Sequence, residues 1–141
     1  MSGYVTFMMG GREMAGRLAE VREVVRAVGI EPLPGARAPV TCLLTLRDVP
    51  LPVVDLRSGA DARDVGDVLV LLADATPDQE VLGLAVDQVL AVLGPEDLVP
   101  LGGDALTWRS LPSYVLEVRR NEAGRAVFVV SLRALAGLVT V

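Results

Sequence analysis

Short apolar runs separated by turn residues account for most of the chain. Runs of about four to eight apolar residues, bounded by glycine, proline or charged residues, are typical of β-strands. The strongest runs cover residues 4–9, 40–46, 51–56 and 68–73. Two further segments, 113–120 and 125–132, flank the turn Asn121–Gly124 and predict a hairpin. Residues 132–138 predict a short final helix.

Two segments allow more than one interpretation. Residues 21–28 (VREVVRAV) fit either a strand or a short helix by periodicity, and their valine content favours a strand. Residues 81–93 are long and apolar, so a helix is possible, but Gly83 and the following Gly94-Pro95 suit a bent strand about as well. Because no long amphipathic helix separates the strands, we expect an all-β barrel or sandwich and not a βαβ sheet.

Composition narrows the chemistry that the chain can perform. Its 141 residues include no histidine and one cysteine, Cys42, so histidine-based catalytic groups, an internal disulfide and a multi-cysteine zinc site are excluded. The net charge is −5 and the 13 basic residues, all arginine, are scattered, which argues against nucleic acid as a partner. We therefore expect a binding protein with no cofactor and no metal, and not an enzyme.

The sequence also bears on location. No stretch reaches the roughly 18 apolar residues of a membrane-spanning helix, and the start of the chain lacks the features of a signal peptide. A cytoplasmic protein without membrane insertion is the expectation.

Isolated candidates for chemistry have plainer structural interpretations. Asp61, Asp64 and Asp67 lie in a polar segment, where solvated surface or a weak cation site is commoner than catalysis. Cys42 lies inside an apolar run without a histidine partner, which favours a small buried hydrophobe over a nucleophile. Gly10-Gly11 lacks the residues of a phosphate-binding loop and predicts a turn.

The segment LRDVPLPVVDLR, residues 46–57, is more informative. Pro52 should lie at a strand start or a sheet edge, because proline has no N–H to donate. Period-two alternation places Asp55 and Arg57 on one face of the strand. An aspartate beside such apolar strands needs partners, so the pair is either a structural salt bridge in a turn or a rigid arginine presented at a docking surface.

Three motifs in this order resemble those of the CheW-like domain family of chemosensory adaptors. Residues 21–24 (VREV) resemble its V-x-E-[IV] segment, and 51–57 (LPVVDLR) closely resemble its P-[VI]-x-D-L-R motif. Residues 82–89 (LGLAVDQV) resemble its G-x-x-V-D-x-V strand. The resemblance extends from about Tyr4 to Leu138.

The resemblance implies one CheW-like domain over residues 1–141, with two SH3-like five-stranded β-barrels joined around a hydrophobic seam and a short C-terminal helix. The first subdomain would comprise residues 16–66 plus the C-terminal segment. The second would comprise 67–130 plus the N-terminal strand. The implied function is that of a non-enzymatic cytoplasmic scaffold, at membrane-associated or cytoplasmic receptor arrays, which couples the hairpin tip of a chemoreceptor to the regulatory domain of a CheA-type histidine kinase.

The resemblance also assigns residues to partners. Receptor contact falls on Val21, Glu23, Cys42 and Arg47. The kinase side falls on Val54 and Leu56. The remaining motif positions are Asp48, Pro52, Asp55, Arg57 and Asp87.

Several positions depart from the family pattern. Cys42 and Asp48 stand where the family has glycine, Thr45 replaces an asparagine, Gly16 replaces a large apolar residue, and Ser131 stands where aspartate is common. The changes at 42 and 48 leave open a divergent module that binds receptors or another regulator but not the kinase. A third alternative is a small-molecule binder or carboxylate hydrolase, which requires a deep pocket containing Asp55 or Asp87.

Overall fold

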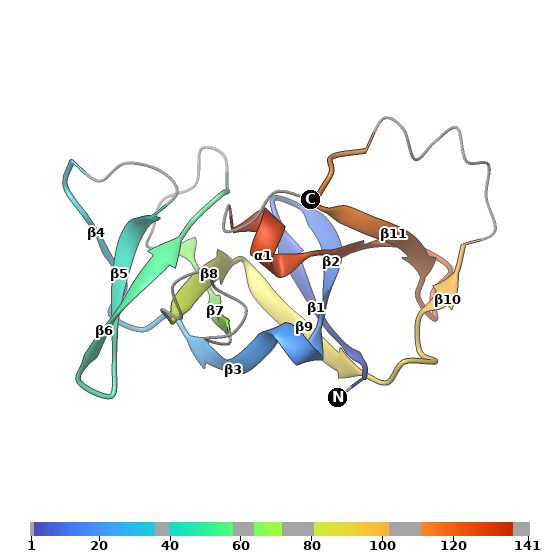
Figure 1. The fold of residues 1–141 in the computed structure, drawn as a ribbon, viewed down its shortest axis with the longest axis horizontal. Helices are drawn as coiled ribbons and strands as arrows, with labels where there is room; N and C mark the ends of the chain where they lie inside the picture. The colour runs from blue at the N-terminus through green and yellow to red at the C-terminus, as the bar shows by residue number, and fades with distance from the viewer. Residues whose placement is uncertain (1, 36–39, 58–63, 72–80, 102–110, 137–141) are drawn as a thin grey trace.

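The computed structural model describes residues 2–35, 40–57, 64–71, 81–101 and 111–136. Within them the chain forms twelve strands, one 3-10 turn and one short helix. The strands divide between two sheets that lie side by side along the long axis of the molecule (Figure 1). The expectation of an all-β fold with two β subdomains is therefore confirmed.

One sheet contains residues from both ends of the chain, and we call it the terminal sheet. Its order is β10-β11-β12-β2-β1-β9. The bounds of these strands are Tyr4–Met9 for β1, Arg12–Arg17 for β2, Gln88–Leu93 for β9, Val99–Pro100 for β10, Val115–Arg120 for β11 and Ala126–Val130 for β12. All pairs are antiparallel except β12 with β2, which are parallel.

The other sheet is built from the middle of the chain, and we call it the central sheet. Its order is β3-β7-β8-β6-β5-β4. The bounds are Val21–Arg26 for β3, Glu31–Pro32 for β4, Val40–Leu46 for β5, Val49–Val54 for β6, Asp67–Leu71 for β7 and Leu82–Val86 for β8. The β6–β8 pair is parallel and the others are antiparallel.

In the described part of the chain each sheet has six strands, and each ends in a two-residue strand, β4 or β10. The chain passes from the central sheet to the terminal sheet between β8 and β9. Strand β7 begins at Asp67 and pairs with β3 and β8, so the central sheet extends to Val86.

The ambiguous segments resolve as strands. Val21–Arg26 is β3, as its valine content indicated. The apolar stretch 81–93 contains no helix: β8 and β9 occupy it and belong to different sheets, with Asp87 between them. Gly83 allows β8 to pack closely, because a Cβ there would lie 2.7 Å from Cγ1 of Val68.

Three apolar clusters form the core. Residues of both sheets share the largest, the seam cluster, which includes Phe7, Leu69 and Leu84. A second cluster fills the central sheet's own interior around Leu44 and Val53, and a third fills that of the terminal sheet. Helix α1, Leu132–Leu135, packs onto the seam cluster and is capped by the Ser131 side chain, which accepts a hydrogen bond from the Ala134 N–H. In the described chain, no helix has the length and apolar character that crossing a membrane requires.

Candidate functional site

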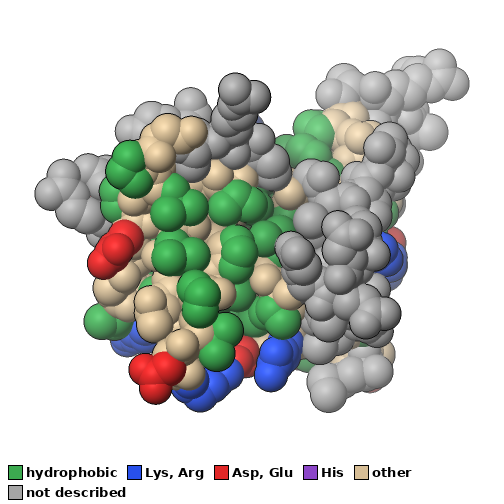
Figure 2. Space-filling view, turned by 60° about the vertical axis from the view of Figure 1, so that its left-hand side comes forward, with side chains coloured by type: hydrophobic (Ala, Val, Ile, Leu, Met, Phe, Trp, Pro, Cys, Tyr) green, Lys and Arg blue, Asp and Glu red, His purple; other side chains and the backbone are tan. Residues whose placement is uncertain are grey.

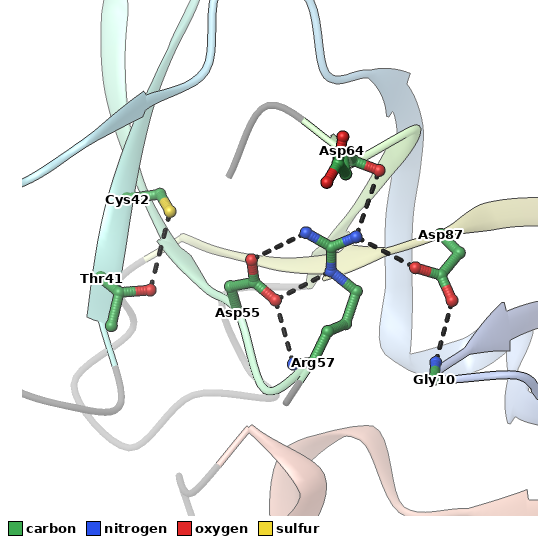
Figure 3. A network of polar contacts seen from close by, with 7 residues as sticks. All are labelled: Gly10, Thr41, Cys42, Asp55, Arg57, Asp64 and Asp87. Atoms are coloured by element: carbon green, nitrogen blue, oxygen red, sulfur yellow. Dashed lines mark hydrogen bonds and ion pairs between the residues drawn. The ribbon is translucent and has the colours of Figure 1, made fainter. Parts of the chain in front are cut away.

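A buried arginine lies where the two sheets meet (Figure 3). The Arg57 side chain is 2% exposed, and its guanidinium donates to both carboxylate oxygens of Asp55, at 2.9 and 3.0 Å. It also donates to Oδ1 of Asp87 at 3.0 Å and to the carbonyl of Asp64 at 3.1 Å. These hydrogen bonds, first those to Asp55 and then that to Asp87, raise the pKa of Arg57 although burial opposes the charge. The guanidinium is therefore permanently charged.

This geometry decides between the two interpretations of the DLR segment. A carboxylate–guanidinium pair with two parallel hydrogen bonds is directional and strong. Asp55 also accepts the backbone N–H of Arg57 at 3.0 Å, which closes a local turn after β6. Because the guanidinium is enclosed, Arg57 is a structural residue of the seam and is not presented at a docking surface.

Asp87 connects this arginine to the opposite sheet. Its second carboxylate oxygen, Oδ2, accepts the backbone N–H of Gly10 at 2.9 Å (Figure 3). Gly10 and Gly11 form the β1–β2 turn with φ of 59° and 80°, as the glycine pair predicted. The DLR and VDQV motifs thus meet in space through Arg57 and Asp87.

The acidic trio of the polar segment separates into different roles. Asp61 lies outside the described residues. Asp64 contributes its backbone carbonyl to Arg57. Asp67 accepts the backbone N–H of Val89 at 2.7 Å, which ties β7 to β9. Its carboxylate therefore has a structural role.

A groove of about 480 Å³ opens on the central sheet. Its walls are mainly apolar and two arginines stand at its margin; the lining includes Arg22, Arg47, Val49, Pro50, Pro52 and Val81. Arg47 donates both terminal nitrogens to the carboxylate of Glu23, one of them at 3.2 Å, and this ion pair lowers the pKa of Glu23. Two of the expected receptor-contact residues are therefore brought together beside the groove.

The prolines of β6 explain why the groove exists. Pro50 and Pro52 pair with Thr45 and Leu43 of β5. The pair that closes a two-residue hairpin is hydrogen-bonded and the pairs then alternate, so the nitrogens at 50 and 52 point away from β5. Proline has no N–H there, and β6 joins β8 only at Val53 and Val54. Pro52 thus lies inside β6, not at its start, on a part of the strand that β8 leaves unpaired.

The tip of the β5–β6 hairpin is exposed and conformationally restricted. Arg47 and Asp48 both have positive φ, 48° and 65°, as a type I′ turn requires at its two central positions. Glycine is favoured in this region, so the family's glycine at position 48 has a backbone reason. Figure 2 brings the β4–β6 side forward and shows hydrophobic side chains over the middle of that face, with acidic and basic side chains at its lower margin.

The other assigned residues differ in accessibility. Leu56 is 41% exposed and Val21 is half-buried against the seam cluster. Cys42 is only 2% exposed and Val54 is fully buried. Cys42 belongs to the cluster inside the central sheet, whereas Val54 faces the other side of β6 and belongs to the seam cluster. Their assignment to partners stays a prediction. The prediction that Cys42 is a small buried hydrophobe is confirmed.

Sequence reasoning missed part of this surface. Val49 and Pro50 were not singled out, although Val49 is 62% exposed and both line the groove. The apolar Val-Pro at the start of a strand was the available signal. Neither Asp55 nor Asp87 lines any of three grooves, of about 480, 400 and 330 Å³, on the described surface, so none of these is the deep carboxylate pocket that the hydrolase alternative requires.

The fold and the site together define a two-sheet β domain with a buried Asp55–Arg57–Asp87 network where the sheets meet. A family model for the CheW-like domain matches residues 3–140. The chain belongs to the CheW-like domain family. Among solved structures it is similar to the scaffolding protein TtCheW from Thermoanaerobacter tengcongensis, with a TM-score of 0.66 and 18% identity over 93% of this chain and 89% of that one. A search of curated proteins finds no match.

Proposed function

We propose that this chain is a cytoplasmic chemosensory adaptor that couples chemoreceptors to a CheA-type histidine kinase through protein contacts, without bond-making of its own. Membership of the CheW-like family supports the adaptor role. The observation that carries the receptor contact is the apolar groove of the central sheet with the Arg47–Glu23 ion pair at its margin.

The groove suits a helical element better than an added strand. A strand would need backbone donors along β6, and Pro50 and Pro52 remove them from the open side. An amphipathic helix binds through side chains alone, with apolar residues in the groove and a polar residue opposite Arg47. The hairpin tip of a chemoreceptor has this character. On the kinase side, Leu56 is the exposed one of the two assigned residues.

Titration calorimetry with a receptor hairpin and with the kinase regulatory domain tests the proposal. Arg47→Gln is expected to weaken receptor binding about ten-fold, or ~1.4 kcal/mol. Arg26→Gln is the matched control, because Arg26 is exposed on β3 of the same sheet but does not line the groove. Absence of binding to both partners would defeat the proposal.

A second candidate is the divergent module that binds receptors but not the kinase. The exposed Asp48 at the hairpin tip favours it, since a charge stands where the family has glycine. Under this candidate the native chain binds the receptor hairpin alone, and Asp48→Gly restores kinase affinity. Kinase binding by the native chain, with the same affinity as the Asp48→Gly variant, would remove this candidate.

A further inference from the structure

We propose that Asp87 and Arg57 form a pin that sets the angle between the two sheets. Both are positioning residues. The inference concerns the domain's internal geometry and is independent of which partner binds, so it goes beyond the proposed function.

The path of the chain makes Asp87 the natural pivot. The chain enters the central sheet through the 3-10 turn Leu18–Glu20 and returns to the terminal sheet between β8 and β9. Strand β8 ends at Val86 and β9 begins at Gln88, so a single residue spans the return. Rotation about the backbone of that residue changes the direction of one sheet relative to the other.

Hydrogen bonds to both sheets restrain this residue. Toward the terminal sheet, the Asp87 N–H donates to the Met8 carbonyl at 2.9 Å and Oδ2 accepts the Gly10 N–H at 2.9 Å. Toward the central sheet, Oδ1 accepts from Arg57 at 3.0 Å. Arg57 is itself fixed by two hydrogen bonds to Asp55. The carboxylate is therefore held from both sides.

Neighbouring contacts reinforce the pin. Asp67 of β7 accepts the Val89 N–H at 2.7 Å, just beyond the pivot. Gly66 passes so close that a Cβ there would lie 2.1 Å from the Asp87 carbonyl oxygen, a contact that only glycine avoids. The two contacts thus join the start of β7 and the residue before it to β9 and the residue before it.

The rest of the seam cannot set an angle equally well. The seam cluster is apolar, with Phe7, Leu69 and Leu84 among its members. Apolar burial stabilises the contact but is non-directional, whereas charge-assisted hydrogen bonds fix geometry. We infer that the apolar cluster holds the sheets together and that the pin determines their orientation.

Distances between paired spin labels test this directly. Val92→Cys on β9 and Val49→Cys on β6 place labels on the two sheets at residues 66% and 62% exposed, in a Cys42→Ala background. Arg57→Met and the milder Asp87→Asn should displace and broaden the inter-sheet distance distribution. Labels at Val24 and Val49, both on the central sheet, should give an unchanged distribution in the same variants.

The matched control is Glu117→Gln, which removes an ion pair with Arg119 that lies within the terminal sheet. It should leave the inter-sheet distribution as in the parent. If Arg57→Met unfolds, as circular dichroism would reveal, Asp87→Asn decides. A folded Asp87→Asn variant with the parent's inter-sheet distance distribution would overturn the inference. The proposed function would not be affected by that result, because it is tested separately by receptor and kinase binding of the native chain.

Discussion

Gly16 of β2 and Leu132 of helix α1 are complementary in volume. A Cβ at position 16 would lie 2.6 Å from Cδ1 of Leu132, and the other branch atoms of that side chain lie within 2.9 Å. Leu132 is fully buried, so it occupies the space that a larger residue at position 16 would fill. This pairing explains one departure from the family pattern: the apolar volume comes from the helix and not from the strand.

Gly16→Ala should therefore destabilise the protein by about 1 to 3 kcal/mol, because an inserted methyl group forces the core to shift. Urea denaturation followed by circular dichroism measures the change. Combining Gly16→Ala with Leu132→Ala should cost less than the sum of the two single changes, since each relieves the other. Gly94→Ala is the control, because a Cβ there meets only Asp97 Oδ2 at 3.4 Å. Strict additivity in the double variant would contradict the pairing.

Much of the fold could be predicted because strand periodicity is local. The runs 4–9 and 40–46 match the observed strands to the residue, because each apolar run and the residues that bound it are adjacent in the sequence. The sheet to which each strand belongs could not be predicted in the same way. Strands β7 and β8 are apolar on both faces, so their pattern does not indicate which strand lies beside them.

The polar site, too, could be predicted only in part. Asp55 and Arg57 are two residues apart, so a contact between them could be predicted from the sequence, although both lie after the end of β6 at Val54 and meet through a local turn and not on a strand face. The contact between Arg57 and Asp87 spans 30 positions and depends on how the sheets meet, which a single sequence does not encode locally. The same reason applies to the burial of Cys42 and Val54, which depends on how the faces of each strand meet the core.

The burial of Cys42 has consequences for its chemistry. Cys42 belongs to the apolar cluster that includes Leu44, Val53 and Val68, and its thiol should react with a disulfide reagent only when the domain opens. We expect labelling at least 100-fold slower in buffer than in denaturing urea. Cys42→Gly, which restores the family's residue, should destabilise by about 1 to 3 kcal/mol through lost packing and backbone freedom. Cys42→Ala should be milder. Rapid labelling of the folded protein would contradict the burial.

The hairpin tip offers a stabilising substitution. Asp48 has φ of 65°, which glycine adopts without strain, so Asp48→Gly should raise the free energy of unfolding by about 1 kcal/mol. Asp48→Val should lower it, because a β-branched residue is disfavoured at positive φ. Urea midpoints of both variants measure this. Glu122→Gly is the control at a turn residue without positive φ, where no gain is expected. A destabilised Asp48→Gly variant would show that the aspartate side chain stabilises the folded state by more than the backbone strain at position 48 destabilises it.

The Arg47–Glu23 ion pair should give stability a dependence on acidic pH. Hydrogen bonding to Arg47 lowers the pKa of Glu23 below its ordinary value of 4.5. The folded state therefore binds this proton less readily than the unfolded chain, so the contribution is present above pH 4.5 and is lost as pH falls through the lowered pKa. Glu23→Gln removes the titrating group and should reduce the loss of stability between about pH 5 and pH 3.

Urea midpoints at pH 6 and pH 3 for the parent and Glu23→Gln provide the measurement. The difference between parent and variant should be present at pH 6, diminish at pH 3 and shrink in 1 M salt, because Arg47 is solvent-exposed and its charge is screened. Glu122→Gln, at an exposed turn of the terminal sheet, serves as the comparison for loss of one carboxylate. If Glu23→Gln and Glu122→Gln respond identically to acid, Arg47 does not hold the Glu23 carboxylate in solution. Under the proposed function, the hairpin tip would then bind a receptor without this preformed ion pair.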